Sequence, residues 1–144
     1  KVDESNSNSL NRAVQWIDVK KNDQVFRLAT THFTWSPNGN YIPLQGQNLE
    51  VMERYLKTDL KEFVLCGDFN SPRGGEIYHR LTQWLSDNVP PEIKTTIDKN
   101  WHRAGDLQFV VDYMFSTPSY RVENVQVHDG VSDHLAVTGI VKKQ

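Results

Sequence analysis

Several features that would narrow the function of a protein are scarce in this sequence. Its 144 residues include a single cysteine, Cys66, so an internal disulfide is excluded and the redox compartment stays open. Cys66 lies within an apolar run and is most simply a small core residue. No apolar stretch is long enough to span a membrane. No His-x-x-x-His or similar His/Cys cluster is present, which argues against a zinc hydrolase.

An excess of positive charge is also absent. Sixteen Lys and Arg side chains against eighteen Asp and Glu give a net charge of −2, so no basic footprint for nucleic acid is present. A nucleic-acid substrate is therefore possible but not favoured. With 38% hydrophobic and 24% charged residues, the chain can bury an ordinary core. Residues 1–10 are polar and rich in Ser and Asn, and we expect a flexible leader there, followed by one folded unit at 11–144.

The rest of the sequence alternates between strand and helix patterns. Two strand-like runs, 14–19 and 24–31, flank a polar turn and predict a hairpin. Apolar residues at helical spacing predict an amphipathic helix through Leu44, Leu49, Met52, Tyr55, Leu56 and Leu60. A second helix is predicted over 76–86. Further strands are predicted at 63–66, 109–115, 121–128 and 135–142.

Polar side chains occur where these strands end or begin. Asp68 and Asn70 follow an apolar strand and are two residues apart, so they share a face and can hold water or a phosphate. An Asx-turn that merely ends the strand is the structural alternative. His32 follows an upstream strand, and Asp133 and His134 precede the last one. In layered α/β folds such strand-end loops build the site.

Asp112 is different because it lies inside an otherwise apolar run, 109–115. An unpaired buried charge is costly, so this carboxylate needs a partner, either a His or Arg across the sheet or backbone amides. Trp35, His102 and Arg103 lie in loops near these candidates, and we predict that they contact substrate. His79 and His128 are interpreted as structural.

The quoted segments also resemble a known family. Their order and approximate spacing are similar to those of the endonuclease/exonuclease/phosphatase superfamily, over about residues 11–141; the segments are Thr31-His32, Gly67-Asp68-Phe69-Asn70-Ser71, Val111-Asp112-Tyr113-Met114-Phe115 and Ser132-Asp133-His134. The resemblance covers the C-terminal half of that domain. It implies an α/β fold with a mostly antiparallel sheet and helices on one face, half of a four-layer α/β sandwich. The other half, with its Asn-bearing strand and metal-binding Glu, has no counterpart before His32.

The resemblance implies metal-dependent hydrolysis of a phosphoester, of phosphodiesterase, phosphatase or nuclease type. Asp68 would activate water, Asn70 would fix the phosphate or that carboxylate, and His32 would contact the phosphate. In the family, the Asp at 112 hydrogen-bonds the His at 134, which would donate to a phosphate oxygen. Mg²⁺, with Mn²⁺ as the alternative, would be held by Asp133, Asp68 and Asn70. Without the Glu of the other half, we expect the isolated chain to be inactive.

Two further expectations concern partners. A non-catalytic binding or interaction module that retains the fold is the alternative to an enzyme. If only this half is present, one sheet face lacks its covering layer, and we expect Leu28, Leu65, Val111 and Val137 to form an exposed apolar patch. The missing half or a second copy of the chain would cover it. The substrate is not identified, although the lack of basic stripes favours a small or lipid-like phosphoester.

Overall fold

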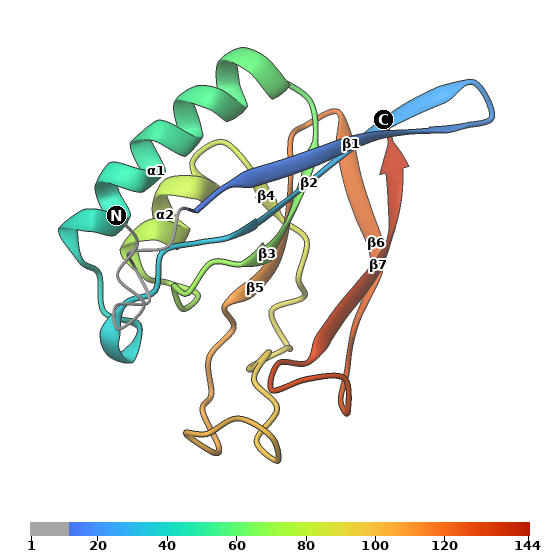
Figure 1. The fold of residues 1–144 in the computed structure, drawn as a ribbon. Helices are drawn as coiled ribbons and strands as arrows, with labels where there is room; N and C mark the ends of the chain where they lie inside the picture. The colour runs from blue at the N-terminus through green and yellow to red at the C-terminus, as the bar shows by residue number, and fades with distance from the viewer. Residues whose placement is uncertain (1–11) are drawn as a thin grey trace.

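The computed structural model describes residues 12–144 (Figure 1). Its main sheet has the strand order β1-β2-β3-β5-β4, and β6 and β7 pair in a separate ribbon. The strands are β1 (Val14–Lys21), β2 (Gln24–His32), β3 (Val64–Asp68), β4 (Ser86–Asp87), β5 (Asp112–Ser116), β6 (Tyr120–His128) and β7 (Ala136–Lys143). The helices are a 3-10 turn (Pro37–Gly39), α1 (Pro43–Tyr55) with a π-helical continuation (Leu56–Leu60), and α2 (Glu76–Thr82). The predicted leader, 1–10, lies outside the described residues.

The main sheet is mixed but mostly antiparallel, which confirms the predicted fold class. β1 and β2 form the predicted hairpin, and Asn22 and Asp23 in its turn have the positive φ that these residue types tolerate. β2 and β3 are parallel, so the chain must cross over one face of the sheet between them. α1 provides this crossover (Figure 1).

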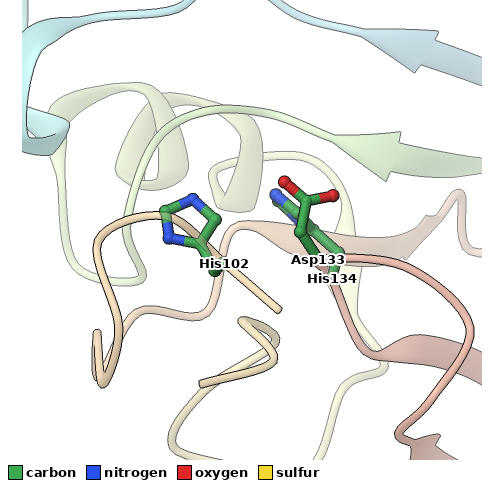
Figure 2. Close-up of side chains that lie close together, drawn as sticks. All are labelled: His102, Asp133 and His134. Atoms are coloured by element: carbon green, nitrogen blue, oxygen red, sulfur yellow. The ribbon is translucent and has the colours of Figure 1, made fainter. Parts of the chain in front are cut away.

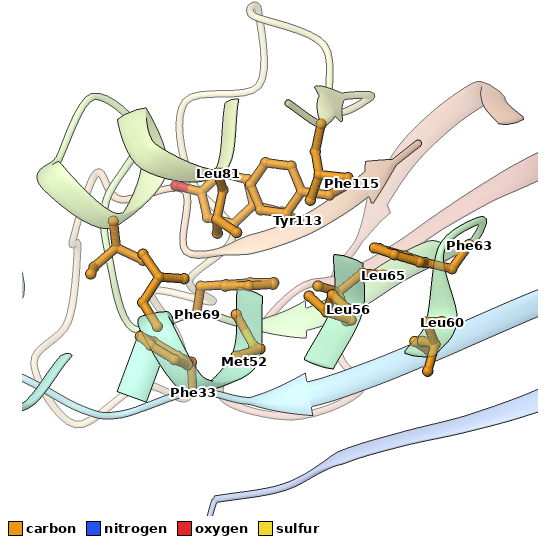
Figure 3. Close-up of a cluster of buried hydrophobic side chains, with 14 of the residues drawn as sticks. Phe33, Met52, Leu56, Leu60, Phe63, Leu65, Phe69, Leu81, Tyr113 and Phe115 are labelled. Atoms are coloured by element: carbon orange, nitrogen blue, oxygen red, sulfur yellow. The ribbon is translucent and has the colours of Figure 1, made fainter. Parts of the chain in front are cut away.

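Both helices cover the same side of the main sheet, here called the helix face (Figure 1). The main core lies beneath them and contains Met52 and Leu56 from α1 and its continuation, Leu81 from α2, and Leu65 and Phe115 from the sheet (Figure 3). The apolar residues whose helical spacing predicted this helix therefore include residues that are buried in the core. Among residues 12–144, no helix is both long and apolar enough to cross a membrane.

The opposite side of the main sheet, here called the ribbon face, is only partly covered. The β6-β7 ribbon lies on this side, and its Tyr120 and Val122 bury Val64 against half-buried Phe26 and Leu28. Farther along the sheet, Ile17 pairs with Leu28 and remains 60% exposed. The ribbon thus covers β3 and the part of β2 around Phe26 and Leu28, and the open part of this face lies over β1, at Ile17.

The prediction of an exposed apolar patch was therefore wrong in the residues that it named. Leu65 is fully buried beneath the helices, Val111 is also buried, and Val137 packs against the main core. In an all-apolar strand the alternation of side chains does not say which set faces the helices. Val64, rather than Leu65, belongs to the ribbon face.

Two predicted boundaries also differ from the structure. The strand expected at 109–115 begins only at Asp112, because the carbonyls of Val110 and Val111 accept hydrogen bonds from Arg73 and Phe69 in a loop. The second helix ends at Thr82 instead of 86, and residues 86–87 form β4 at the sheet edge.

The last two strands do not extend the main sheet. Asn88 lies between β5 and β6, where its side chain donates to the carbonyl of Met114 and accepts the N–H of Val122. A side-chain amide thus replaces direct strand pairing at this point, and β6 and β7 form their own layer.

Candidate active site

The ends of three neighbouring strands form a row of polar residues across the main sheet. In the strand register His32 is opposite Asp68, and Asp68 is opposite Asp112. These side chains share a face with Val64 and Cys66, which pack against the ribbon, so the row lies on the ribbon face. His32 Nε2 is 3.4 Å from Asp68 Oδ2. Three of the candidate residues are thus brought together.

His134 joins this row from the loop before β7. Its Nδ1 lies 2.8 Å from Asp112 Oδ2, which gives this half-buried carboxylate a partner. This hydrogen bond raises the pKa of His134 to about 9, against the opposing effect of burial. The imidazolium form therefore persists at neutral pH, and its Nε2–H remains available to a ligand.

The surroundings of Asp68, in contrast, disfavour its charged form. Burial raises the pKa of its carboxyl group, and the nearby charge of Asp112 raises it further. The N–H of Asn70 and the rings of His134 and His32 act in the other direction. A carboxylate whose charge is disfavoured in this way is a stronger base and a good neighbour for a cation.

The backbone around Asp68 explains how the motif is held. Gly67 has φ +138°, and a Cβ there would lie 1.9 Å from the carbonyl oxygen of Thr31, so only glycine fits between the strands. Asn70 has φ +48° and its N–H donates to Asp68 Oδ1 at 2.7 Å, which is an Asx-turn. The Asn70 side chain also donates to the carbonyl of Phe33 at 3.1 Å. This bond holds the amide, and it leaves the Asn70 side-chain oxygen for another partner.

A second group of side chains lies beside His134. His102, Asp133 and His134 each place a possible ligand atom within 4.8 Å of the other two (Figure 2). Of the residues predicted to bind metal, Asp133 belongs to this group, whereas Asp68 and Asn70 lie at the end of β3. Among residues 12–144 no other group of three His, Cys, Asp or Glu side chains converges so closely.

Asp98 fixes the position of this second group, and the sequence analysis missed it. Its N–H donates to the carbonyl of Asp133 at 3.1 Å, and its own carbonyl accepts the N–H of His102 at 2.8 Å. Its buried carboxylate accepts the N–H of Gly130 at 3.2 Å. Asp98 therefore ties the loop that carries His102 to the loop that carries Asp133. No motif distinguishes it in the sequence from an ordinary turn aspartate.

Gln45 is a second residue that the sequence analysis missed. It lies in the first turn of α1 and is 1% exposed. Its side-chain amide donates to the carbonyls of Thr34 and Asn70, at 2.9 and 3.3 Å. Gln45 thus holds the loop after His32 against the loop after Asp68. A polar residue at the start of an amphipathic helix gave no sign of this role.

The three predicted substrate contacts line one pocket. Trp35, His102 and Arg103 enclose a volume of about 390 Å³ together with Asn70 and His134. The pocket therefore opens onto the polar row. His128, interpreted as structural, contacts Thr138 of the neighbouring strand, and His79 lies against Tyr78 in α2.

The oxygen donors at this end of the sheet suit a hard divalent cation. Asp68 and Asp133 offer carboxylates and Asn70 offers an amide oxygen, which are ligand types that Mg²⁺ prefers. Burial, and then the charge of Asp112, raises the pKa of Asp68, so a nearby cation would favour its charged form. Asp133 converges with His102 and His134, whereas Asp68 and Asn70 lie at the end of β3, so few protein oxygens are gathered at one point and Mg²⁺ would keep several waters there.

Comparison with known proteins identifies the fold. No family model matches the sequence, and no curated protein matches it. Several solved structures do match. An endonuclease/exonuclease/phosphatase from Bacteroides vulgatus superposes with a TM-score of 0.70 at 20% identity, over 92% of this chain and 56% of that one. A mannosyl-6-phosphatase from Bacteroides thetaiotaomicron gives 0.60 at 16% identity, over 91% and 57%. The human Nocturnin catalytic domain gives 0.62 at 15% identity, over 92% and 53%.

These matches have one pattern in common. The chain is covered almost completely, yet it spans only about half the length of each structure. The chain therefore has the fold of part of an endonuclease/exonuclease/phosphatase domain, in agreement with the resemblance seen in the sequence.

Proposed function

We infer that this chain carries one half of the active site of a metal-dependent phosphoester hydrolase. The observation that supports this best is the convergence of four separate sequence segments on one sheet end. There His134 pairs with Asp112 at 2.8 Å, and Asp112 lies opposite Asp68 in the register. A row of polar side chains by itself is also explained by structural roles such as ending a strand. A half-buried carboxylate beside an imidazolium that a second carboxylate holds is instead suited to hydrolysis of an anionic ester, because it offers a base for water and a donor for a phosphate oxygen.

Each residue has a role that its surroundings support. Asp68, with its raised pKa, would take the proton of the attacking water. The Asn70 side chain, held by Phe33, would orient the phosphate or the Asp68 carboxylate. His134 would donate from Nε2 to a phosphate oxygen on which charge develops. His32, which is exposed next to Asp68, would contact the phosphate from the other side.

A divalent cation would complete the site. Asp133, Asp68 and Asn70 would hold Mg²⁺ or Mn²⁺, which would neutralise charge on the phosphate oxygens. The Nocturnin catalytic domain is described with a bound sulfate anion, and one similar protein is named a mannosyl-6-phosphatase. Both descriptions agree with an anionic phosphate-like ligand for this fold.

The same comparisons support a missing partner. Because the chain spans about half of each similar structure, we propose that a second half completes the domain over β1 and β2, where Ile17 is exposed. On this proposal the isolated chain is inactive, because too few ligands remain to hold the cation firmly.

Activity assays on the full-length protein that carries this chain would test the proposal. The panel includes a DNA substrate, a bis-aryl phosphodiester, an inositol phosphate and a sugar phosphate, each with Mg²⁺, with Mn²⁺ and with EDTA. We expect hydrolysis of at least one phosphoester that EDTA abolishes and that H134A lowers at least about a hundredfold. Absence of hydrolysis with every substrate and both metals would favour a non-catalytic binding module with the same fold.

A further inference from the structure

The two members of the His134–Asp112 pair belong to different layers of the fold. Asp112 begins β5 of the main sheet, whereas His134 lies in the loop before β7 of the separate ribbon. Their contact at 2.8 Å therefore joins two segments that do not pair with each other as strands. Because a hydrogen bond weakens outside a narrow range of distance and angle, these two segments must be held at a fixed separation.

Thr96 fixes the main chain at Asp112. It is fully buried, and its Oγ1 accepts the N–H groups of Val111 and Asp112, each at 3.1 Å. The N–H of Thr96 donates in turn to the carbonyl of Phe109 at 2.9 Å. Two adjacent main-chain N–H groups are thus accepted by one side-chain oxygen. A buried N–H group that loses its acceptor carries the full cost of its desolvation, so removal of this hydroxyl should loosen the start of β5.

The same residue reaches the loop that carries His134. The carbonyl of Thr96 accepts the N–H of Leu135 at 2.8 Å, and the next residue, Ile97, forms an antiparallel β-bridge with His134. Ser132 also bonds the main chain of His134, but it belongs to the same loop and cannot set the distance of that loop from the main sheet. Thr96 therefore bonds the main chain on both sides of the pair.

A buried threonine can also bond main-chain groups for a purely structural reason, and Thr117 is an example in this chain. Its hydroxyl bonds the N–H and the carbonyl of Phe63, at 3.1 and 3.3 Å, and the side chain is buried. Phe63 precedes β3 and Thr117 follows β5, so these bonds lie at the end of the two strands opposite to the polar row. Thr117 is therefore a matched comparison for Thr96.

We propose that Thr96 is a positioning residue of the candidate active site, and that it holds His134 and Asp112 at hydrogen-bonding distance. Because it is fully buried, Thr96 touches neither substrate nor cation and acts only through the pair. Its hydroxyl is the group that matters: serine keeps this acceptor, whereas valine keeps the shape of threonine without it. A role in catalysis rests on the function proposed above, but the positioning of the pair can be measured without it.

The ring proton of His134 reports directly on the pair. A carboxylate accepts and does not donate, so the shared proton is on Nδ1, and its exchange with water is slowed while the hydrogen bond to Asp112 holds. In nuclear magnetic resonance of the full-length protein, isotope-labelled at histidine, H134Q identifies this signal by its absence. At one fixed pH, T96V should speed the exchange by at least about tenfold, because two buried N–H groups lose their acceptor. T96S should leave the exchange rate nearly unchanged.

Matched variants separate positioning from stability. T117V makes the same substitution at the other end of the strands, so it should lower the unfolding temperature as T96V does but leave the ring-proton exchange unaltered. If T96V does not fold, T96A decides, because its smaller side chain leaves room for a water to bond the two N–H groups. T96A should fold and still speed the exchange. The inference is overturned if the folded Thr96 variant leaves the exchange unaltered, if T117V speeds it equally, or if wild type shows no protected ring proton.

Activity then tests what the positioning serves. With Mg²⁺ and the bis-aryl phosphodiester, or the substrate of the panel above that is hydrolysed, T96V should lower kcat by at least about tenfold with KM nearly unchanged. T96S should retain most of the activity. In an H134A background T96V should cause no further loss, because Thr96 acts through that ring. Equal fractional losses in both backgrounds would overturn the catalytic part of the inference. If no phosphoester is hydrolysed, the proposed function fails, and the ring-proton exchange still decides whether Thr96 positions the pair.

Discussion

The two faces of the main sheet differ in how completely they are covered. On the helix face, α1 and α2 bury a continuous core that includes Leu65 and Phe115, both fully inaccessible. On the ribbon face, β6 and β7 cover β3 and part of β2, whereas Ile17 on β1 is 60% exposed. All of the polar row lies on this second face. The main core and the polar row thus lie on opposite sides of one sheet.

This separation has an energetic basis. Burial raises the pKa of Asp68, and repulsion from the like charge of Asp112 raises it further, so bringing these charges together has an energetic cost. Such a cost is tolerated where apolar burial elsewhere is sufficient. The helix face provides that burial, so the ribbon face can hold a site that is not optimised for stability.

The largest effect is expected from a cavity on the helix face. Phe115 stacks on Tyr113 and packs edge-to-face against Phe69. Phe115→Ala should lower the free energy of unfolding by about 3–5 kcal/mol, because it leaves a cavity in a close-packed core. Urea denaturation measures this. Val51→Ala, on the exposed side of α1, is the control and should change stability by less than about 0.5 kcal/mol. Similar losses in both variants would contradict the described core.

The next effect concerns activity without loss of structure. Asp68→Asn keeps an acceptor for the N–H of Asn70 but removes the base, so kcat of the full-length protein should fall at least about a hundredfold. The unfolding temperature should not fall, because the substitution removes a charge that burial disfavours. Asp18→Asn, which breaks only an exposed pair with Arg27 on β2, is the control with unaltered kcat. A fully active Asp68→Asn protein would rule out this residue as the base.

A smaller effect is a dependence of stability on pH. The folded-state pKa of His134 is about 9, raised from 6.5. Its contribution to stability should be complete below about pH 6.5 and decline as the pH rises towards 9, because the folded state then loses its extra affinity for the proton. Unfolding in chelator-containing buffers from pH 6 to 9 measures this decline. His134→Gln should show a flatter profile, and an unchanged slope would contradict the His134–Asp112 pair.

The smallest effect in the isolated chain should come from the open part of the ribbon face. Ile17→Ser is expected to change the unfolding free energy by less than about 0.5 kcal/mol, because the side chain is already exposed. In the full-length protein the cost should exceed about 1 kcal/mol, since a covering layer would bury it. Light scattering of the chain alone shows whether a second copy covers this face instead. Equal, small effects in both proteins would argue against any partner there.

The sequence was informative where one residue pattern had one physical outcome. The spacing of Leu49, Met52 and Leu56 predicted the buried side of α1, and these side chains are buried. The charge of Asp112 within an apolar run required a partner, and the structure provides one in His134. The sequence thus predicted a contact in the site where leaving a charged group unpaired would have been costly.

Other features depended on contacts between distant segments. The run from Phe63 to Leu65 is apolar throughout, so its two faces were indistinguishable without the helices and the ribbon. Asp98 and Gln45 act through backbone groups of other loops, which leave no pattern in the sequence. Separation of β6 and β7 from the main sheet depends on the side chain of Asn88. Tertiary structure alone determined these outcomes.

The parallel pairing of β2 with β3 has a consequence for the order in which the protein folds. The β1-β2 hairpin closes a short turn, whereas His32 can meet Asp68 only after the whole crossover through α1 has been ordered. His134 must then close a further long loop onto Asp112. Each closure costs chain entropy before any contact compensates for it. We therefore expect the hairpin amides to gain hydrogen-exchange protection early in refolding, and the polar row to be completed last.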